Sequence, residues 1–359
     1  MNKLKVVHIV EALGGGVYSY FINLTHVLCN DPNLEVTVIY SDQRKEVNLK
    51  QIVKDFHPDT RLICLPMQRE ISLIKDWNAF KNIRQALLKI NPDVLHLHSS
   101  KAGILGRFAH IFSPSVKAKL FYTPHGFSFL QKDIDALKRF TFYLIEFLSQ
   151  KLSGGTLIAC GDTELTHAKK IGPALLVRNG IKNNPELRKN LKINTEIKTI
   201  GILGRITYAR NPDLFNQIAL ANPDIKFIWI GDGELRKRLT APNIEITGWF
   251  KKQTEGLHKL EKLDLYLQTS LWEGLPFALL EASARGIPIL ATNIIGNKDI
   301  VTSGKTGFLF ENLEEFDEAL KLLKPFEIRE KMGKASAKRT KLLFNSCKNF
   351  KKLISIYQA

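Results

Sequence analysis

The sequence predicts two tandem α/β domains, each built on a doubly wound parallel sheet. Short apolar or β-branched runs alternate with longer amphipathic stretches along the whole chain, which is typical of a parallel sheet with helices on both faces. Residues 180–196 interrupt this pattern with a polar, turn-rich segment, after which the pattern restarts. The length of 359 residues also exceeds the size at which one hydrophobic core usually stops growing.

The first domain is expected over residues 1–182 and contains seven strand candidates. Helical patterns separate them, for example over residues 72–90, where apolar side chains recur at helical spacing. The seven candidates are KVVHIV (5–10), LEVTVIY (34–40), RLICL (61–65), DVLHLH (93–98), KLFYTPH (119–125), TLIAC (156–160) and ALLVRN (174–179).

The second domain is expected over residues 197–340, followed by a helix over residues 341–359 that packs back on the first domain. Ligands of doubly wound sheets bind at the carboxyl ends of the strands, so we expect the two domains to face each other across a substrate cleft. The strand candidates of the second domain are IKTIGILG (197–204), IKFIWIG (225–231), IEITGW (244–249), LDLYLQT (263–269), IPILAT (287–292) and GFLF (307–310).

Composition limits the partners and the compartment. The net charge of +17 indicates an anionic partner such as a phosphorylated substrate, an anionic membrane or nucleic acid. We expect no nucleic acid, because no zinc finger, RNP-type motif or aromatic ladder accompanies the basic residues. The four cysteines are scattered without a C-x-x-C pair, which favours the cytoplasm and disfavours structural zinc. No apolar run is long enough for a signal peptide or a membrane span.

Three consecutive glycines, Gly14, Gly15 and Gly16, follow the first strand candidate. Glycine allows positive φ and close approach of a ligand, and the N-terminus of the helix that follows favours phosphate. Two interpretations remain open: an anion site, or a turn that only needs to be tight. An NAD enzyme is disfavoured, because the spacing is not G-x-G-x-x-G.

Two further loops of the first domain carry polar groups at strand ends. His96 and His98 alternate along a strand, and residues 99–103 supply Ser, Lys and Gly at the start of a helix that could hold an anion. His96 and His98 share a face, so a metal pair is conceivable, but no third ligand lies nearby and we expect a structural role. His125 follows another strand and Pro124, where a functional role and a packed histidine are both open.

The second domain carries the strongest pattern. Arg205 follows a strand and Arg210 comes five residues later, before a helix, so that two guanidinium groups could bind a diphosphate bidentately. Glu273 precedes another helix and Glu281 lies about two turns inside it. A separation of about 12 Å over eight helical residues is too long for a glycosidase carboxylate pair. It favours an elongated ligand, with backbone amides such as that of Gly274 meeting an anion between the two carboxylates.

Taken together, these motifs resemble those of GT-B glycosyltransferases of the family 4 type. The resemblance covers essentially the whole chain and rests on the glycine-rich first loop, HSSKAG, TPHG, VRNGI, GRITYARNP, IGDGELRKRL, TGW and the E-x7-E segment EGLPFALLEA. It implies two Rossmann-like domains, a nucleotide-sugar donor, for which we expect a UDP-sugar, and transfer with retention of configuration and without a metal or other cofactor. Within the family, the chain looks most like bacterial enzymes of capsule, exopolysaccharide or O-antigen synthesis, whose acceptors are usually polyprenyl-diphosphate-linked saccharides.

The resemblance also implies roles for individual residues. Gly15 and Gly16 would approach the donor phosphates. His125 would contact the donor sugar and act in catalysis by stabilising developing oxocarbenium charge. Arg205 and Arg210 would neutralise the departing diphosphate. The second basic residue of the family is usually Lys, so Arg210 keeps the charge and changes the donor geometry.

In the same way, Glu273 would bind hydroxyls of the transferred sugar and Glu281 the ribose. The backbone amides of Gly274 and Leu275 would contribute to donor binding. Lys182 stands where an acid is common in the family, which puts contacts from that turn in doubt.

Residues 135–152 have a composition suited to an anionic membrane interface. Lys138 and Arg139 precede a run rich in apolar and aromatic residues, so we expect a peripheral enzyme on the inner face of the cytoplasmic membrane. The alternative is a core helix with solvated basic residues. The apolar members of the run are Phe140, Phe142, Tyr143, Leu144 and Phe147.

Three rival functions are weaker. A GT-A enzyme needs a metal-binding D-x-D, and the one match, Asp133 with Asp135, looks like a helix cap. A GT-B nucleotide-sugar epimerase shares the two-domain plan but does not usually present the E-x7-E helix. A non-catalytic nucleotide-sugar binding protein would not hydrolyse sugar nucleotides.

Overall fold

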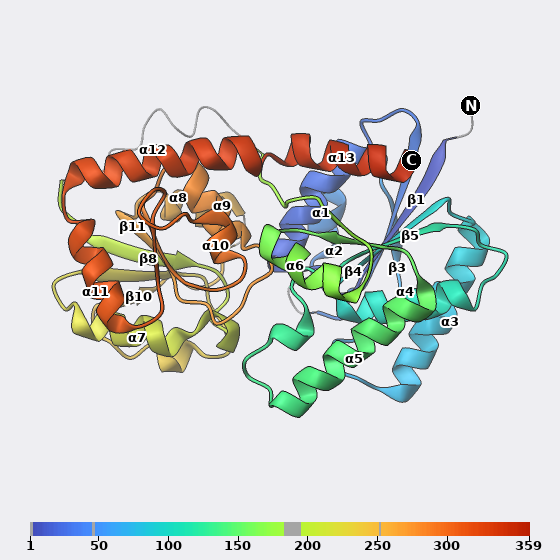
Figure 1. Cartoon of the computed structure of the whole chain (residues 1–359), viewed down its shortest axis with the longest axis horizontal. Helices are drawn as coiled ribbons and strands as arrows, with labels where there is room; N and C mark the ends of the chain where they lie inside the picture. Colours follow the sequence, from blue (N-terminus) through green and yellow to red (C-terminus); the bar gives the residue numbers. More distant parts are fainter. Residues whose placement is uncertain (1–2, 45–46, 183–194, 251–252) are drawn as a thin grey trace. The chain divides into compact units, whose positions relative to one another are not determined.

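The computed structural model describes residues 3–44, 47–182, 195–250 and 253–359. It divides the chain into two compact units (Figure 1). Unit 1 comprises Met1–Leu130, Ile134–Asn179 and Ser346–Ala359, and unit 2 comprises Gln131–Asp133 and Gly180–Asn345. Most of the predicted linker, residues 183–194, lies outside the described residues.

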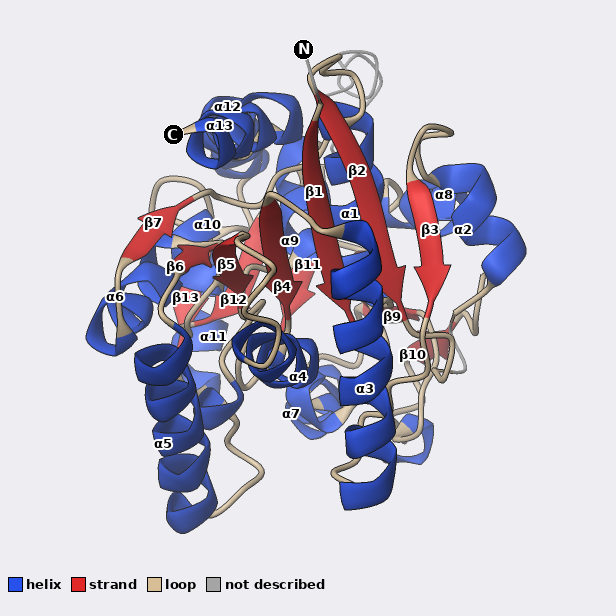
Figure 2. Ribbon diagram, turned by 90° about the vertical axis from the view of Figure 1, so that its right-hand side faces the viewer, coloured by secondary structure: helices blue, strands red, loops and turns tan. Residues whose placement is uncertain are grey.

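Unit 1 is built on a parallel sheet of seven strands in the order β3-β2-β1-β4-β5-β6-β7, which can be followed in Figure 2. Each strand coincides with one predicted from the apolar runs. The strands are β1 (Leu4–Val10), β2 (Leu34–Tyr40), β3 (Arg61–Cys64), β4 (Val94–His98), β5 (Lys119–Thr123), β6 (Thr156–Ala159) and β7 (Ala174–Leu176).

The helices of unit 1 cover both faces of its sheet. One face carries a core formed with α3, α4 and α6, and on the other face side chains of β1 and β4 contact aromatic rings of α1 and α13. The helices are α1 (Gly15–Leu28), α2 (Leu49–Asp55), α3 (Leu73–Ile90), α4 (Ser100–Ile111), α5 (Ala136–Ser153), α6 (Asp162–Ile171) and α13 (Ser346–Gln358), with the 3-10 turn η1 (Ser128–Leu130).

Unit 2 contains a second parallel sheet, with the strand order β10-β9-β8-β11-β12-β13. Its strands also coincide with the predicted runs: β8 (Thr199–Leu203), β9 (Lys226–Ile230), β10 (Ile244–Ile246), β11 (Leu265–Gln268), β12 (Ile289–Thr292) and β13 (Phe308–Phe310). Its helices are α7 (Pro212–Ala221), α8 (Gln253–Leu260), α9 (Phe277–Ala284), α10 (Asn297–Ile300), α11 (Leu313–Leu322) and α12 (Phe326–Leu343), with the 3-10 turns η3 (Tyr208–Arg210) and η4 (Arg236–Arg238). The predicted pair of doubly wound α/β domains is confirmed.

The chain changes units at residues that differ slightly from the predicted domain boundaries at 182 and 341. Residues 180–182 belong to unit 2, where the N–H of Ile181 donates to the carbonyl of Phe344 at 3.0 Å. At the other end, α12 continues to Leu343 in unit 2, and α13 then returns to unit 1 and packs against α1. Three side chains of α13 are fully buried there: Phe350, Leu353 and Tyr357.

Alternation along the two central strands of unit 1 separates apolar from polar buried side chains. Val7 and Ile9 of β1 lie in the same core as Leu95 and Leu97 of β4. The residues between them point to the opposite face, because successive side chains of a strand alternate. On that face the register pairs His8 directly with His96.

No helix in the described ranges is both long and apolar enough to cross a membrane.

Candidate functional site

The glycine turn at the end of β1 leaves a helix N-terminus open. Helix α1 begins at Gly15, which has φ of +52°, and no side chain of the described residues caps it. A Cβ at Gly15 would meet nothing within 4 Å, so the backbone conformation, and not lack of space, requires glycine here. Gly15 and Gly16 are exposed, and their N–H groups can donate hydrogen bonds to an anion at the positive end of the helix.

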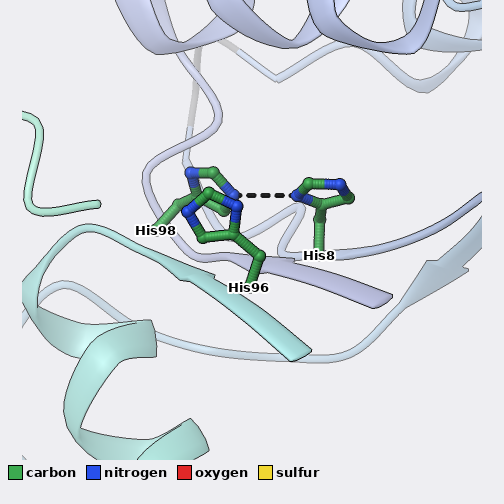
Figure 3. A group of neighbouring side chains, drawn as sticks. All are labelled: His8, His96 and His98. Atoms are coloured by element: carbon green, nitrogen blue, oxygen red, sulfur yellow. Dashed lines mark hydrogen bonds between the residues drawn. The ribbon is translucent and has the colours of Figure 1, made fainter. Parts of the chain in front are cut away.

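Four histidines gather where β1, β4 and β5 end. His8, His96 and His98 are fully buried, with their imidazole rings grouped as in Figure 3, and His125 follows β5 in a left-handed conformation with φ of +54°. The expectation that His96 and His98 lack a third histidine is wrong. His8 escaped notice because the pairing of β1 with β4, and not sequence proximity, brings it beside His96.

Hydrogen bonds link three of these rings in a row, the imidazole chain of His125, His98 and His8. Nε2 of His125 lies 3.1 Å from Nδ1 of His98, and Nε2 of His98 lies 2.9 Å from Nδ1 of His8. Burial lowers the pKa of His8 and of His125 to about 3, and it holds the pKa of His96 and His98 well below the usual range. All four imidazoles are therefore neutral near neutral pH.

The same residues offer a metal only a poor site. One nitrogen each of His8, His96 and His98 lies within 4.8 Å of the others. However, His96 already uses both nitrogens, with the Tyr357 hydroxyl at 2.6 Å and the Thr123 hydroxyl at 2.9 Å. A cation would have to break such bonds, so the donor set fits a hydrogen-bonded network of neutral imidazoles better than a metal centre.

The predicted anion loop at residues 99–103 is used differently. Nζ of Lys101 lies 2.8 Å from both carboxylate oxygens of Asp76, so its charge is already neutralised. A Cβ at Gly103 would lie 2.5 Å from the ring of Tyr122, which makes this glycine a packing residue. The structure does not favour an anion site at these two residues.

In unit 2, Arg205 and Arg210 follow β8 and lie on one connected loop. Trp229 Nε1 donates to the carbonyl of Gly204 at 2.9 Å, and Thr269 Oγ1 donates to the carbonyl of Arg210 at 2.7 Å. These bonds fix the backbone at both ends of the loop. Both guanidinium groups face acidic partners, with Nε of Arg205 at 3.5 Å from a carboxylate oxygen of Glu234.

Glu273 is the ion-pair partner of Arg210. Nη1 of Arg210 lies 2.8 Å from Oε1 of Glu273, at an angle that does not form a hydrogen bond. The same oxygen accepts hydrogen bonds from Gln268 at 3.0 Å and Ser270 at 2.8 Å. The two residues were predicted to contact different parts of one ligand, and the structure brings them together.

Glu281 lies about one turn inside α9, and not two, because α9 begins at Phe277. The prediction that Glu273 and Glu281 are separated by eight helical residues is therefore wrong, because the residues before Phe277 are not helical. The Glu281 carboxylate is hydrogen-bonded to Arg285, which also contacts Glu261 at 3.1 Å. Burial raises the pKa of Glu281, although the nearby guanidinium opposes the shift.

The turn before α9 presents unoccupied backbone donors. Among the described residues, the N–H groups of Gly274 and Leu275 have no acceptor, and no side chain caps the helix. Gly296, with φ of +83°, packs against this turn, and a Cβ there would lie 2.5 Å from the carbonyl of Gly274. The sequence gives no signal for Gly296 beyond its place after a strand, because the contact is between distant segments.

Each unit therefore carries a candidate functional part of its own. The part in unit 2 combines two guanidinium groups with free amides and can bind a diphosphate. The part in unit 1 combines a free helix N-terminus with neutral imidazoles, which can exchange hydrogen bonds with hydroxyl groups.

Comparison with known proteins agrees with this chemistry. Residues 183–339 match the family model of group 1 glycosyl transferases. The chain is 27% identical to the UDP-Gal:alpha-D-GlcNAc-diphosphoundecaprenol alpha-1,3-galactosyltransferase of Escherichia coli, over 99% of this chain and 97% of that protein. It is 24% identical to the capsular polysaccharide biosynthesis glycosyltransferase CapM of Staphylococcus aureus, with 90% of each chain covered.

Solved structures of low sequence identity share the fold. Sucrose-phosphate synthase from Thermosynechococcus elongatus aligns with a TM-score of 0.80 at 14% identity, over 99% of this chain and 98% of that chain. Anabaena HepE in complex with UDP and glucose aligns with a TM-score of 0.77 at 14% identity, over 99% of each chain. The protein is thus a glycosyltransferase of the GT-B fold. Within that class, the chain is similar to enzymes of the family 4 type.

Proposed function

We propose that this glycosyltransferase moves a sugar from a UDP-sugar to a lipid-linked saccharide in the synthesis of a bacterial surface polysaccharide. The observation that carries the proposal is the combination, in unit 2, of Arg205 and Arg210 with the free amides of Gly274 and Leu275. A diphosphate with two to three negative charges is the ligand that suits such a set. The name of the Escherichia coli relative supports both the UDP donor and the diphosphoundecaprenol acceptor.

Transfer breaks the bond between the anomeric carbon and the diphosphate and forms a bond to an acceptor hydroxyl oxygen. Charge grows on the leaving diphosphate in the transition state, where Arg205 and Arg210 stabilise it. An incoming diphosphate competes with Glu273 for Arg210, and the released carboxylate is then free to accept hydrogen bonds from sugar hydroxyls. In unit 1, Gly15 and Gly16 are proposed to bind the donor phosphates, and the His125 imidazole is proposed to bind the donor sugar.

We further propose that the reaction is metal-independent and retains the anomeric configuration. The guanidinium groups and the helix N-termini supply roughly the positive charge that a divalent ion supplies in other enzymes. No carboxylate is assigned as a nucleophile, so the acceptor attacks the face from which the diphosphate leaves.

The experiment is transfer from UDP-galactose and other UDP-sugars to diphosphoundecaprenol-linked GlcNAc, with EDTA present, followed by proton NMR of the product. An α-linked product from an α-linked donor is expected. A β-linked product would refute retention. Loss of activity in EDTA that Mg²⁺ or Mn²⁺ restores would refute metal independence. Conversion of the UDP-sugar to its epimer in the absence of acceptor would show that the protein is an epimerase and not a transferase.

We also propose that unit 1 docks on an anionic membrane through α5. In this helix the polar residues Glu146 and Gln150 are buried against Arg107, whereas six large apolar side chains are exposed. The alternative of a core helix is wrong, because Phe140 is 62% exposed. The exposed apolar residues of α5 are Leu137, Phe140, Leu144, Ile145, Leu148 and Leu152.

Unit 1 has a second exposed apolar group, on α3. Leu73, Ile74 and Trp77 at the start of α3 are exposed, and both views place the N-terminal ends of α3 and α5 at the same end of unit 1 (Figures 1 and 2). Exposed apolar patches of this kind mark interaction sites. Lys138 and Arg139 on α5 add the charge that an anionic leaflet attracts, at about 1 kcal/mol per residue.

Flotation with phosphatidylglycerol vesicles tests the docking surface. The double substitution Phe140→Ser with Leu144→Ser should abolish flotation, and high salt should weaken it in the unchanged protein through screening. Leu322→Ser is the matched control, because Leu322 is as exposed as the two targets but lies on α11 of unit 2. Equal flotation of the double variant and the control, or of the protein on neutral and anionic vesicles, would refute the proposal.

A further inference from the structure

The imidazole chain of His125, His98 and His8 connects a residue of the proposed donor site to the interior of unit 1. The His98 and His125 rings are inclined by only 22°, and the His8 and His98 rings by 35°. The N···N distances of 3.1 Å and 2.9 Å allow one nitrogen of each pair to donate to the other. The chain ends at Nε2 of His8, a buried atom for which the described residues offer no partner.

The unpaired end of the chain determines its direction. A neutral imidazole has one N–H and one bare nitrogen, so the protons of the row can point only from His8 toward His125 or the reverse way. The reverse direction would leave the N–H of His8 Nε2 buried without an acceptor, whereas the first leaves only a bare lone pair there. Buried N–H groups without partners are rarer than under-satisfied acceptors. The favoured direction therefore runs from His8 to His125.

In this direction His8 Nδ1 donates to His98, and His98 Nδ1 donates to Nε2 of His125. Because Nε2 of His125 accepts this hydrogen bond, the proton of the neutral His125 ring lies on Nδ1. The ring is further held by Tyr20, whose ring meets it edge-on at 4.7 Å. The following residue is fixed as well, because the N–H of Gly126 donates to Glu164 at 2.7 Å.

We infer that His8 and His98 are positioning residues, which keep His125 neutral with its proton on Nδ1 as a fixed hydrogen-bond donor to an oxygen of the bound sugar. The inference rests on the proposed function only for the identity of that ligand. A neutral donor can bind a sugar oxygen without repelling the positive charge that develops at the anomeric carbon, whereas an imidazolium would repel it. The low pKa that burial gives His125 agrees with this state.

The experiment measures the tautomer directly, on the full chain labelled with ¹⁵N in the histidine rings. Long-range ¹H–¹⁵N spectra at neutral pH distinguish an Nδ1–H ring from an Nε2–H ring, and His125→Gln assigns the signal. We expect a single Nδ1–H tautomer for His125. An Nε2–H ring or a mixture of the two tautomers in the unchanged protein would overturn the inference without any buried substitution having to fold.

Two variants then test the origin of the tautomer. His98→Phe should turn the His125 signal into that of a mixture, because no donor faces Nε2 any longer. His96→Phe is the matched control: His96 is equally buried on the same face of the same strand, but bonds Tyr357 and Thr123 outside the row. The control should leave the His125 signal unchanged. An unchanged signal in His98→Phe would refute the role of His98.

Metal analysis of the same sample provides a further check. We expect no bound metal. One metal ion per chain, together with ¹⁵N chemical shifts typical of coordinated ring nitrogens, would show that the histidines form a metal site and not a hydrogen-bonded row. Failure to transfer sugar from any UDP-sugar would remove the proposed function. It would leave the tautomer of His125, which the spectra report without substrate, unaffected.

Discussion

The two units hold their candidate functional groups in opposite ways. In unit 1 the polar groups are neutral imidazoles, buried and bonded to one another. In unit 2 they are charged groups, and Arg205 and Arg210 are each held by a carboxylate. Burial without charge keeps a donor or acceptor in one orientation, whereas an ion pair keeps a charge available that an anionic ligand can take over. The difference teaches that the imidazoles of unit 1 can only exchange hydrogen bonds, whereas the guanidinium groups of unit 2 can neutralise an anionic ligand.

The largest expected effect comes from the guanidinium groups of unit 2. Arg205→Ala and Arg210→Ala should each lower kcat/KM by about 10² or more, because the charge they stabilise is greatest in the transition state. Steady-state kinetics with the preferred UDP-sugar, alongside circular dichroism to confirm folding, measures the effect.

Lys334→Ala is the matched control for this prediction. Lys334 also belongs to unit 2 and pairs with Glu330 at 2.8 Å, but its side chain is exposed, so its loss should cost little. Near wild-type turnover in both arginine variants would mean that Arg205 and Arg210 do not stabilise the leaving diphosphate.

A smaller effect should separate the two carboxylates of unit 2. Glu281→Gln should weaken binding of UDP about tenfold, equivalent to about 1.4 kcal/mol, because Glu281 is proposed to accept hydrogen bonds from the ribose. Glu273→Gln should not weaken UDP binding, because Glu273 competes with the diphosphate for Arg210, and it should lower sugar transfer, because Glu273 acts on the sugar hydroxyls. Titration calorimetry with UDP, paired with the transfer assay, compares the two variants.

Both substitutions keep the shape of the side chain and remove one charge from an ion pair, so each serves as the control for the other. If the two variants bind UDP equally well or equally badly, the proposed division between ribose and sugar is wrong.

The smallest expected effect is that of removing metal ions. The rate of transfer should stay the same within error in excess EDTA, because Arg205, Arg210 and the free amides of unit 2 already supply the positive charge. A rate that falls as the EDTA concentration rises, and that added Mg²⁺ restores, would show that the positive charges of unit 2 are not sufficient.

The fold could be predicted from the sequence because each strand of the two sheets is a short apolar run between helical patterns. LEVTVIY and KFIWI, for example, become β2 and β9 at the predicted residues. The return of α13 to unit 1 depends on buried residues such as Tyr357 and Phe350, whose partners lie far away in sequence. Local patterns identify an amphipathic helix, but they do not identify the surface on which it packs.

The candidate site was only partly predictable. Residues in recognisable loops, such as Arg205, Arg210 and Glu273, were found because the motif and the end of a strand coincide. His8 was missed, since a lone histidine in an apolar run becomes significant only through the register between β1 and β4. The pairing of Arg210 with Glu273 could not be predicted either, because it joins two loops that are separated by 63 positions in the chain.

The place of α13 has a consequence for how the chain folds during synthesis. Domains generally fold as they are made, with the N-terminal one first. Here Tyr20 of α1 and the imidazole of His96 contact Phe350 and Tyr357 of α13, which are made after unit 2. Unit 1 is therefore translated first but cannot complete its core until unit 2 has been made. A chain truncated before α13 would expose the apolar side chains that α13 covers, and such a surface is a ready target for chaperones and proteases.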